Sequence, residues 1–110
     1  ESETEEKALR AIAETTARLH EAGYWHKDYS GGNILWGETP EGIAVELIDL
    51  NRMRLGTVTL ERGCANFDRL EATERHQRIM AEAYAAARGF DIETVFRLIV
   101  KARKKLLARS

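Results

Sequence analysis

The stretch that most constrains this chain is residues 24–37, YWHKDYSGGNILWG. A histidine, a lysine and an aspartate stand together in it, followed by two glycines and an asparagine. Polar residues and paired glycines at this density do not build a hydrophobic core, because buried polar groups need partners and glycine has no side chain to pack. The stretch therefore predicts a loop whose backbone holds several side chains around one point.

The composition of the chain is that of a folded domain. Its 110 residues suit one domain or part of one, with 44% hydrophobic and 32% charged residues. The formal net charge is −1, so the overall charge predicts neither a nucleic-acid nor a membrane partner. Cys64 is the only cysteine, which excludes an intrachain disulfide and favours a reducing compartment with a buried structural thiol. No apolar run approaches the ~20 residues that span a bilayer.

The first half of the chain predicts a helix and a hairpin on either side of the polar loop. Residues 5–22 repeat apolar positions on one helical face, and Gly23 follows as a left-handed terminator. Residues 33–36 and 44–50 are short β-rich runs, and GETPEG between them has the composition of a turn. The expected inner face of the helix consists of Leu9, Ile12, Ala13, Thr16, Leu19 and His20.

The second half predicts two further helices. Residues 51–64 show no clean period and are expected to form a loop or a short strand. A helix is predicted from Asn66 to about Arg88, with Gly89 as its end, and Asp91 is the expected N-cap of the last helix. The fold class is therefore predicted to be mainly α (α+β), with one hairpin.

Three polar side chains are expected to converge at that hairpin. Asp28 and Asn33 are separated by four residues, and Asp49 ends the second predicted strand. A hairpin brings its two ends together, so Asn33 and Asp49 should face each other with Asp28 one loop away. Carboxylate and amide oxygens are ligands that Mg²⁺ prefers, and phosphoryl transfer needs such a metal together with a carboxylate that orients the attacking hydroxyl. Each of the three residues also has a structural interpretation, as a turn, cap or strand-end residue.

The spacing of these residues resembles a known catalytic loop. The run from His26 to Asn33 matches the protein-kinase pattern H-R-D-L-x-x-x-N, and Ile48-Asp49-Leu50 stands where D-F-G would follow. More closely, the segments LHEAGYWHKDYSGGNILW, VELIDLNRMRLG and ERGCANFDRL resemble the bacterial lipopolysaccharide kinases, which phosphorylate Kdo or heptose of the inner core. The resemblance covers roughly residues 9–72. Asn51 and Arg52 replace the glycine of D-F-G, and no A-P-E segment follows, so a phosphorylated activation loop is not expected.

The resemblance implies a role for each residue of the loop. Asp28 would be the catalytic base, while Asn33 and Asp49 would bind Mg²⁺ and, through it, ATP. His26 and Lys27 would belong to the scaffold of the catalytic loop, and Lys27 either approaches a phosphate or points to solvent.

The resemblance also implies a function for the whole protein. It would be a bacterial, cytoplasmic, ATP- and Mg²⁺-dependent kinase that phosphorylates a hydroxyl of a lipopolysaccharide inner-core sugar. Its partner would be the core glycolipid or another small-molecule acceptor. The basic last helix is either a solvated helix face, which is the commoner case, or a peripheral contact with the inner face of the inner membrane.

Residues 1–110 would be the helical C-terminal lobe of a protein kinase-like fold, with the hairpin carrying the catalytic site. No G-x-G-x-x-G and no V-A-I-K-like strand precede the first helix. We therefore expect a fragment that lacks the N-terminal lobe and is inactive by itself.

Two other functions remain open from the sequence. A small-molecule kinase of the aminoglycoside or choline type uses a similar loop, and a pseudokinase or binding module would keep the fold without turnover. Trp25, Trp36 and Tyr24 are expected to be packing residues rather than a sugar-stacking platform. Gly31 and Gly32 are expected to let the backbone turn tightly.

Overall fold

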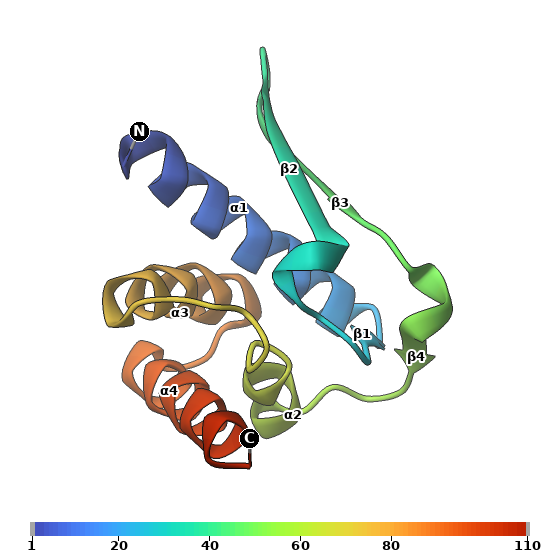
Figure 1. The fold of residues 1–110 in the computed structure, drawn as a ribbon, viewed down its shortest axis with the longest axis vertical. Helices are drawn as coiled ribbons and strands as arrows, with labels where there is room; N and C mark the ends of the chain where they lie inside the picture. The colour runs from blue at the N-terminus through green and yellow to red at the C-terminus, as the bar shows by residue number, and fades with distance from the viewer. Residues whose placement is uncertain (1, 110) are drawn as a thin grey trace.

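The first helix, α1 (Ser2–Glu21), opens the computed structural model, which describes residues 2–109 and is mainly helical (Figure 1). The helix begins three residues earlier than predicted. Gly23 ends the turn after it with a φ of 88°, a left-handed conformation that glycine adopts without strain. Most of the predicted inner face is buried, namely Ile12, Ala13, Thr16 and His20.

The predicted hairpin is present, and its strands are longer toward the turn than expected. β2 (Ile34–Thr39) pairs with β3 (Gly42–Leu47) in antiparallel register, so the turn consists only of Pro40 and Glu41. The second strand was predicted to reach residue 50, and this was wrong. It ends at Leu47 because Asp49 has a φ of 61°, which no strand can accommodate.

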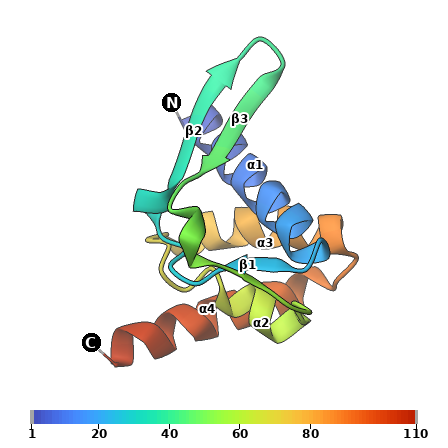
Figure 2. The same cartoon turned by 90° about the vertical axis from the view of Figure 1, so that its right-hand side faces the viewer.

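A second strand pair lies where the sequence showed no clean period. β1 (Tyr24–His26) pairs antiparallel with β4 (Met53–Leu55), so the chain returns to the start of the polar loop after the hairpin. The hairpin projects at one end of the molecule and α4 (Ile92–Ala108) lies at the other, which both views show (Figures 1 and 2).

The prediction of one helix from Asn66 to about Arg88 was wrong at its start. A short helix, α2 (Leu60–Ala65), ends at Asn66, and α3 (Glu74–Arg88) begins eight positions later than predicted. Thr73 starts α3 through a capping box, in which its hydroxyl accepts the N–H of His76 and its own N–H donates to His76 Nδ1. Residues 66–73 are therefore a turn segment.

The ends of the last two helices agree with the sequence. Gly89 terminates α3 with a φ of 76°. The Asp91 carboxylate accepts the N–H of Thr94 at 2.9 Å and caps α4, as predicted. Within residues 2–109, no helix combines the length and apolar character needed to cross a bilayer.

The core gathers aromatic rings beneath the polar loop. Phe67 meets Tyr84 edge to face at 5.1 Å between ring centres, and Tyr29 meets Phe67 at 6.5 Å. Tyr29 belongs to the polar loop itself, yet only 1% of it is exposed, and its hydroxyl hydrogen-bonds the hydroxyl of Thr16 on α1. Edge-to-face pairs of this kind add about 0.5–1.5 kcal/mol beyond their buried area. The loop is thus fixed to the core through one of its own side chains.

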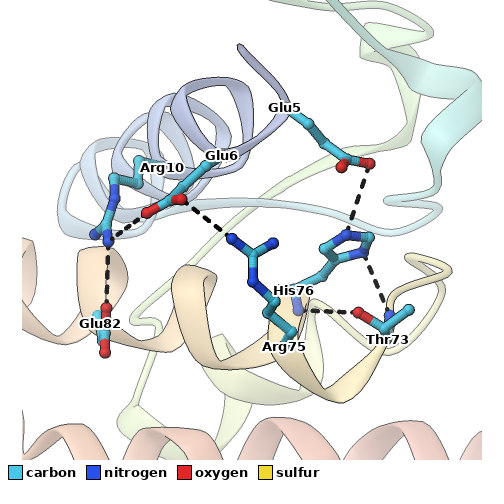
Figure 3. A network of polar contacts seen from close by, with 7 residues as sticks. All are labelled: Glu5, Glu6, Arg10, Thr73, Arg75, His76 and Glu82. Carbon is cyan, nitrogen blue, oxygen red and sulfur yellow. Dashed lines mark hydrogen bonds and ion pairs between the residues drawn. The ribbon is translucent and has the colours of Figure 1, made fainter. Parts of the chain in front are cut away.

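Ion pairs at the surface connect the acidic start of α1 to α3 (Figure 3). Glu6 pairs with Arg75 at 3.3 Å and with Arg10 at 3.2 Å, and Arg10 reaches Glu82 on α3 at 3.3 Å. Exposed pairs contribute about 0–1 kcal/mol each, so this network adds little to the stability of the fold.

A buried polar network joins α1, α2 and α3 at their other ends. His20 Nδ1 accepts from the Tyr84 hydroxyl at 2.6 Å, and Arg88 donates to the same hydroxyl at 2.8 Å. His20 Nε2 donates to the Asn66 side-chain oxygen at 3.0 Å. A side chain at Gly63 would collide with the Tyr84 hydroxyl, so glycine is what allows α2 to approach α3 here.

This network makes the stability of the fold depend on pH. The pKa of His20 is lowered from its ordinary 6.5 to about 4, chiefly because the buried imidazolium would lose its water. The hydrogen bond to Asn66 opposes this shift, and the positive charge of Arg88 adds to it. Between pH 6.5 and about 4 the unfolded chain therefore binds a proton that the folded chain excludes. Neutral His20 therefore makes its full contribution to the free energy of unfolding above pH 6.5. This contribution, roughly 3 kcal/mol, is lost as the pH falls toward 4.

Urea unfolding of His20→Gln across this pH range checks the assignment. We expect the wild type to lose more stability than the variant between about pH 7 and about pH 4.5, whatever their difference at neutral pH. His76→Gln is the control, because His76 lies near the surface and should leave the steep loss in place. Parallel losses in the wild type and His20→Gln would contradict the assignment.

Candidate active site

The polar loop, residues 27–33, joins β1 to β2 and is anchored at both ends. The N–H of Lys27 donates to the carbonyl of Arg52 at 2.8 Å, which continues the β1–β4 pairing. The N–H of Asn33 donates to the carbonyl of Ser30 at 3.0 Å and closes a turn before β2. With Tyr29 buried between these anchors, the loop has little freedom to move.

His26 is fully buried at the start of the loop and connects the loop to the residue that directly follows β3, at the base of the hairpin. Its Nδ1 accepts the N–H of Asp28 at 3.0 Å, and its Nε2 donates to the carbonyl of Ile48 at 3.1 Å. These two bonds require the neutral tautomer with the proton on Nε2. The imidazole thereby sets the distance between the backbone of Asp28 and the segment that carries Asp49.

Asn33 completes the connection from the opposite side. Its side-chain NH₂ donates to the carbonyl of Asp28 at 2.8 Å, and its backbone carbonyl accepts the N–H of Ile48 at 3.0 Å. The amide oxygen of Asn33 is then the end of the side chain that remains for a cation. The backbone of Asn33 therefore lies beside Ile48, the residue that precedes Asp49.

Asp49 has the one left-handed conformation of a non-glycine residue among residues 2–109, with φ 61° and ψ 52°. Such a conformation costs of order 1 kcal/mol and is concentrated at functional sites. It turns the chain from β3 into a short 3₁₀ turn, Leu50–Arg52. The carboxylate is 40% exposed and lies 3.8 Å from Arg52 Nε, so it is accessible and faces a positive charge.

The Asp28 carboxylate is half exposed while its backbone is held on both sides. The side chain is 47% exposed, which leaves it open to a substrate, and its Oδ1 lies 3.9 Å from Arg69 Nε. The backbone N–H is bound by His26 and the backbone carbonyl by Asn33. An accessible carboxylate on a fixed backbone is what a positioned base requires.

The donor set at the hairpin base suits a hard cation. An amide oxygen of Asn33 and a carboxylate of Asp49, both partly exposed, match the oxygen ligands of Mg²⁺, which usually keeps several waters or takes phosphate oxygens as well. In the part of the chain that the structure describes, no three His, Cys, Asp or Glu side chains gather into a metal cluster. Water and phosphate would therefore supply the remaining ligands of a Mg²⁺ ion bound here.

The structure reveals site residues that the sequence did not identify. Arg69 was predicted to lie in a helix, but it belongs to the 66–73 turn, which places it beside Asp28. The residues around Arg69 in the chain give no sign of this position. Trp36 and Tyr24, which were expected to be packing residues, are 45% and 43% exposed, so neither belongs to the buried core. Trp25 is partly buried beneath the guanidinium of Arg62.

The interpretation of the paired glycines also changes. Neither Gly31 nor Gly32 has a positive φ, so the backbone conformation does not require glycine at either position. A side-chain carbon at Gly31 would meet no atom within 4 Å, and at Gly32 only the Ser30 hydroxyl at 3.9 Å. The glycines keep space open beside the loop rather than permit a tight turn.

Comparison with known proteins identifies a family. A family model described as lipopolysaccharide kinase (Kdo/WaaP) family matches residues 1–88, a span that includes the 27–33 loop, the hairpin and α3. No curated protein gives a significant match.

Removing the imidazole tests how much the site depends on it. His26→Ala leaves the Asp28 N–H and the Ile48 carbonyl without their partner and opens a cavity, so we expect the free energy of unfolding to fall by about 3 kcal/mol. Lys27→Ala, at the neighbouring exposed position, should change it by less than about 0.5 kcal/mol. Urea unfolding measures both, and equal stabilities for the two variants would contradict this role of His26.

Proposed function

Because the chain belongs to the lipopolysaccharide kinase (Kdo/WaaP) family, we propose that it transfers phosphate from ATP to a hydroxyl of an inner-core sugar, Kdo or heptose. Membership supports a kinase, and hence a transferase of lipopolysaccharide biosynthesis. The observation that carries the finer proposal is the group of hydrogen bonds that fixes Asp28, Asn33 and the segment before Asp49 at one end of the hairpin.

Asp28 is the proposed base. An acceptor hydroxyl beside its carboxylate would give its proton to Asp28 as it attacks the phosphate. Because the backbone is fixed, the carboxylate would already be in position when the reaction begins. The exposure of this side chain supports the role, because a bulky glycolipid must reach it from solvent.

Asn33 and Asp49 are the proposed Mg²⁺ ligands and, through the metal, the residues that hold ATP. A bound Mg²⁺ would neutralise negative charge on the phosphates of ATP during phosphoryl transfer. The left-handed backbone of Asp49 supports this role, because it directs the chain away from the strand at the residue that would bind the metal. His26 and Lys27 would serve the loop as scaffold, His26 through its ring and Lys27 through its backbone N–H.

We further propose that residues 1–110 form the helical lobe of a kinase-like fold. The order of a helix, the 27–33 loop, a hairpin and Asp49 agrees with the order that the resemblance implied, and β4 then returns to pair with β1. A cytoplasmic location at the inner face of the membrane suits the exposed cations of α4, which would attract anionic lipid. Those cations are Arg97, Lys101, Lys104 and Lys105.

Replacing the proposed base in the full-length protein tests the reaction. Asp28→Asn keeps the backbone bonds to His26 and Asn33 but cannot accept a proton, so we expect kcat to fall by about 10²–10⁴-fold with little change in ATP affinity. Phosphate transfer from Mg²⁺–ATP to a Kdo- and heptose-containing core lipid would be followed by mass spectrometry.

Glu41→Gln in the hairpin turn is the matched control, because it also removes one exposed carboxylate and should keep full turnover. An Asp28→Asn variant as fast as this control would show that Asp28 is not the base. A wild type that left core sugars untouched but phosphorylated a soluble amino alcohol would overturn the proposed substrate.

A further inference from the structure

A groove of about 520 Å³ opens beside the 27–33 loop, on the side of Ser30, Gly31 and Gly32. Ile12 of α1 and Met80 of α3 give it an apolar floor. Its volume falls within the range of small-molecule sites. The absence of side chains at the two glycines keeps its edge open next to the loop.

The rim of the groove carries the side chains that sugars use. Trp36 lines it from β2 with nearly half of its surface exposed, and Arg69 and Glu71 line it from the 66–73 turn. An aromatic face packs against the C–H groups of a sugar ring, while a carboxylate and a guanidinium bond its hydroxyls. A polyphosphate would be disfavoured by Glu71, and a purely apolar ligand would leave both charges without partners. A polyhydroxylated ring suits this lining best.

Arg69 connects the groove to the proposed base. It lines the groove and also lies 3.9 Å from the carboxylate of Asp28. Ser30, another lining residue, donates its N–H to the carbonyl of Asp28 at 3.0 Å. A ring bound in the groove would therefore contact Arg69 and Ser30, the two lining residues that also contact Asp28.

We propose that this groove binds the sugar ring of the phosphate acceptor, with Trp36 against one face of the ring and Arg69 and Glu71 bonded to its hydroxyls. The inference rests on the proposed function, since it locates the acceptor of the same reaction. It also gives Trp36 a role that its exposed position in β2 otherwise leaves unexplained.

Titration with free sugars tests the groove without turnover. Kdo and, separately, the neutral inner-core heptose are added to ¹⁵N-labelled protein, and the indole N–H signals of Trp25 and Trp36 are followed by NMR. Trp36→Phe assigns the two signals. We expect a saturable shift of the Trp36 signal with at least one sugar and little change at Trp25, which lies beneath Arg62 and outside the groove lining.

Matched variants complete the test. Glu71→Gln and Trp36→Ala should each weaken sugar binding by about tenfold and raise the KM for the core lipid with kcat less affected, as expected for lost substrate binding. Glu41→Gln should change neither, and the amide spectra of all variants report that they are folded.

The outcomes separate this inference from the proposed function. A saturable Trp36 shift that depends on Glu71 supports the groove even if no phosphate transfer is found, in which case the proposed function fails. Transfer that depends on Asp28 but is unchanged by Glu71→Gln and Trp36→Ala overturns the groove and leaves the kinase intact. A shift at Trp25 alone, or no saturable shift with either sugar, overturns it as well.

Discussion

The imidazole of His26 connects its own loop to a segment that begins 22 positions later, since one ring nitrogen accepts the N–H of Asp28 and the other donates to the carbonyl of Ile48. Asn33 spans the same two segments through its side chain and its backbone carbonyl. Because both connections are made by fixed or buried groups, the loop and the base of the hairpin behave as one unit. Asp28 and Asp49 are attached to this unit by their backbones, while their carboxylates stay open to solvent.

The stability of the core and the geometry of the site are connected through Asn66. Its side-chain NH₂ donates to the carbonyl of His26 at 2.9 Å, and its oxygen accepts from the buried ring of His20 at 3.0 Å. The network that makes the fold sensitive to acid therefore contacts the strand from which the polar loop starts. Tyr29 adds a second connection, because its ring packs against Phe67 in the core. The loop is rigid through the packing beneath it as well as through its own hydrogen bonds.

The features that could be predicted from the sequence are those that depend on neighbours in the chain. The helical period of α1, the N-cap at Asp91 and the spacing from His26 to Asn33 are all local signals. The three-residue strands β1 and β4 are too short to show a period, and their pairing depends on contacts between distant segments. The start of α3 at Thr73 was missed although its N-cap is a local signal, whereas the position of Arg69 beside Asp28 depends on contacts between distant segments. The role of the paired glycines became clear only from the space around them.

Asn33 and Asp49 are the proposed metal-binding end of the site, with Asp28 beside it. Mn²⁺ can replace Mg²⁺ at oxygen ligands, and its unpaired electrons broaden the NMR signals of nearby nuclei. In a titration with Mn²⁺ and ATP, we expect the Asn33 side-chain amide and the Asp49 backbone amide to lose intensity first, followed by Asp28. The same titration without ATP distinguishes binding of Mn²⁺ at the site from weak binding of Mn²⁺ at exposed carboxylates elsewhere. Loss of signal confined to the acidic start of α1, with Asn33 and Asp49 unchanged when ATP is present, would contradict the account.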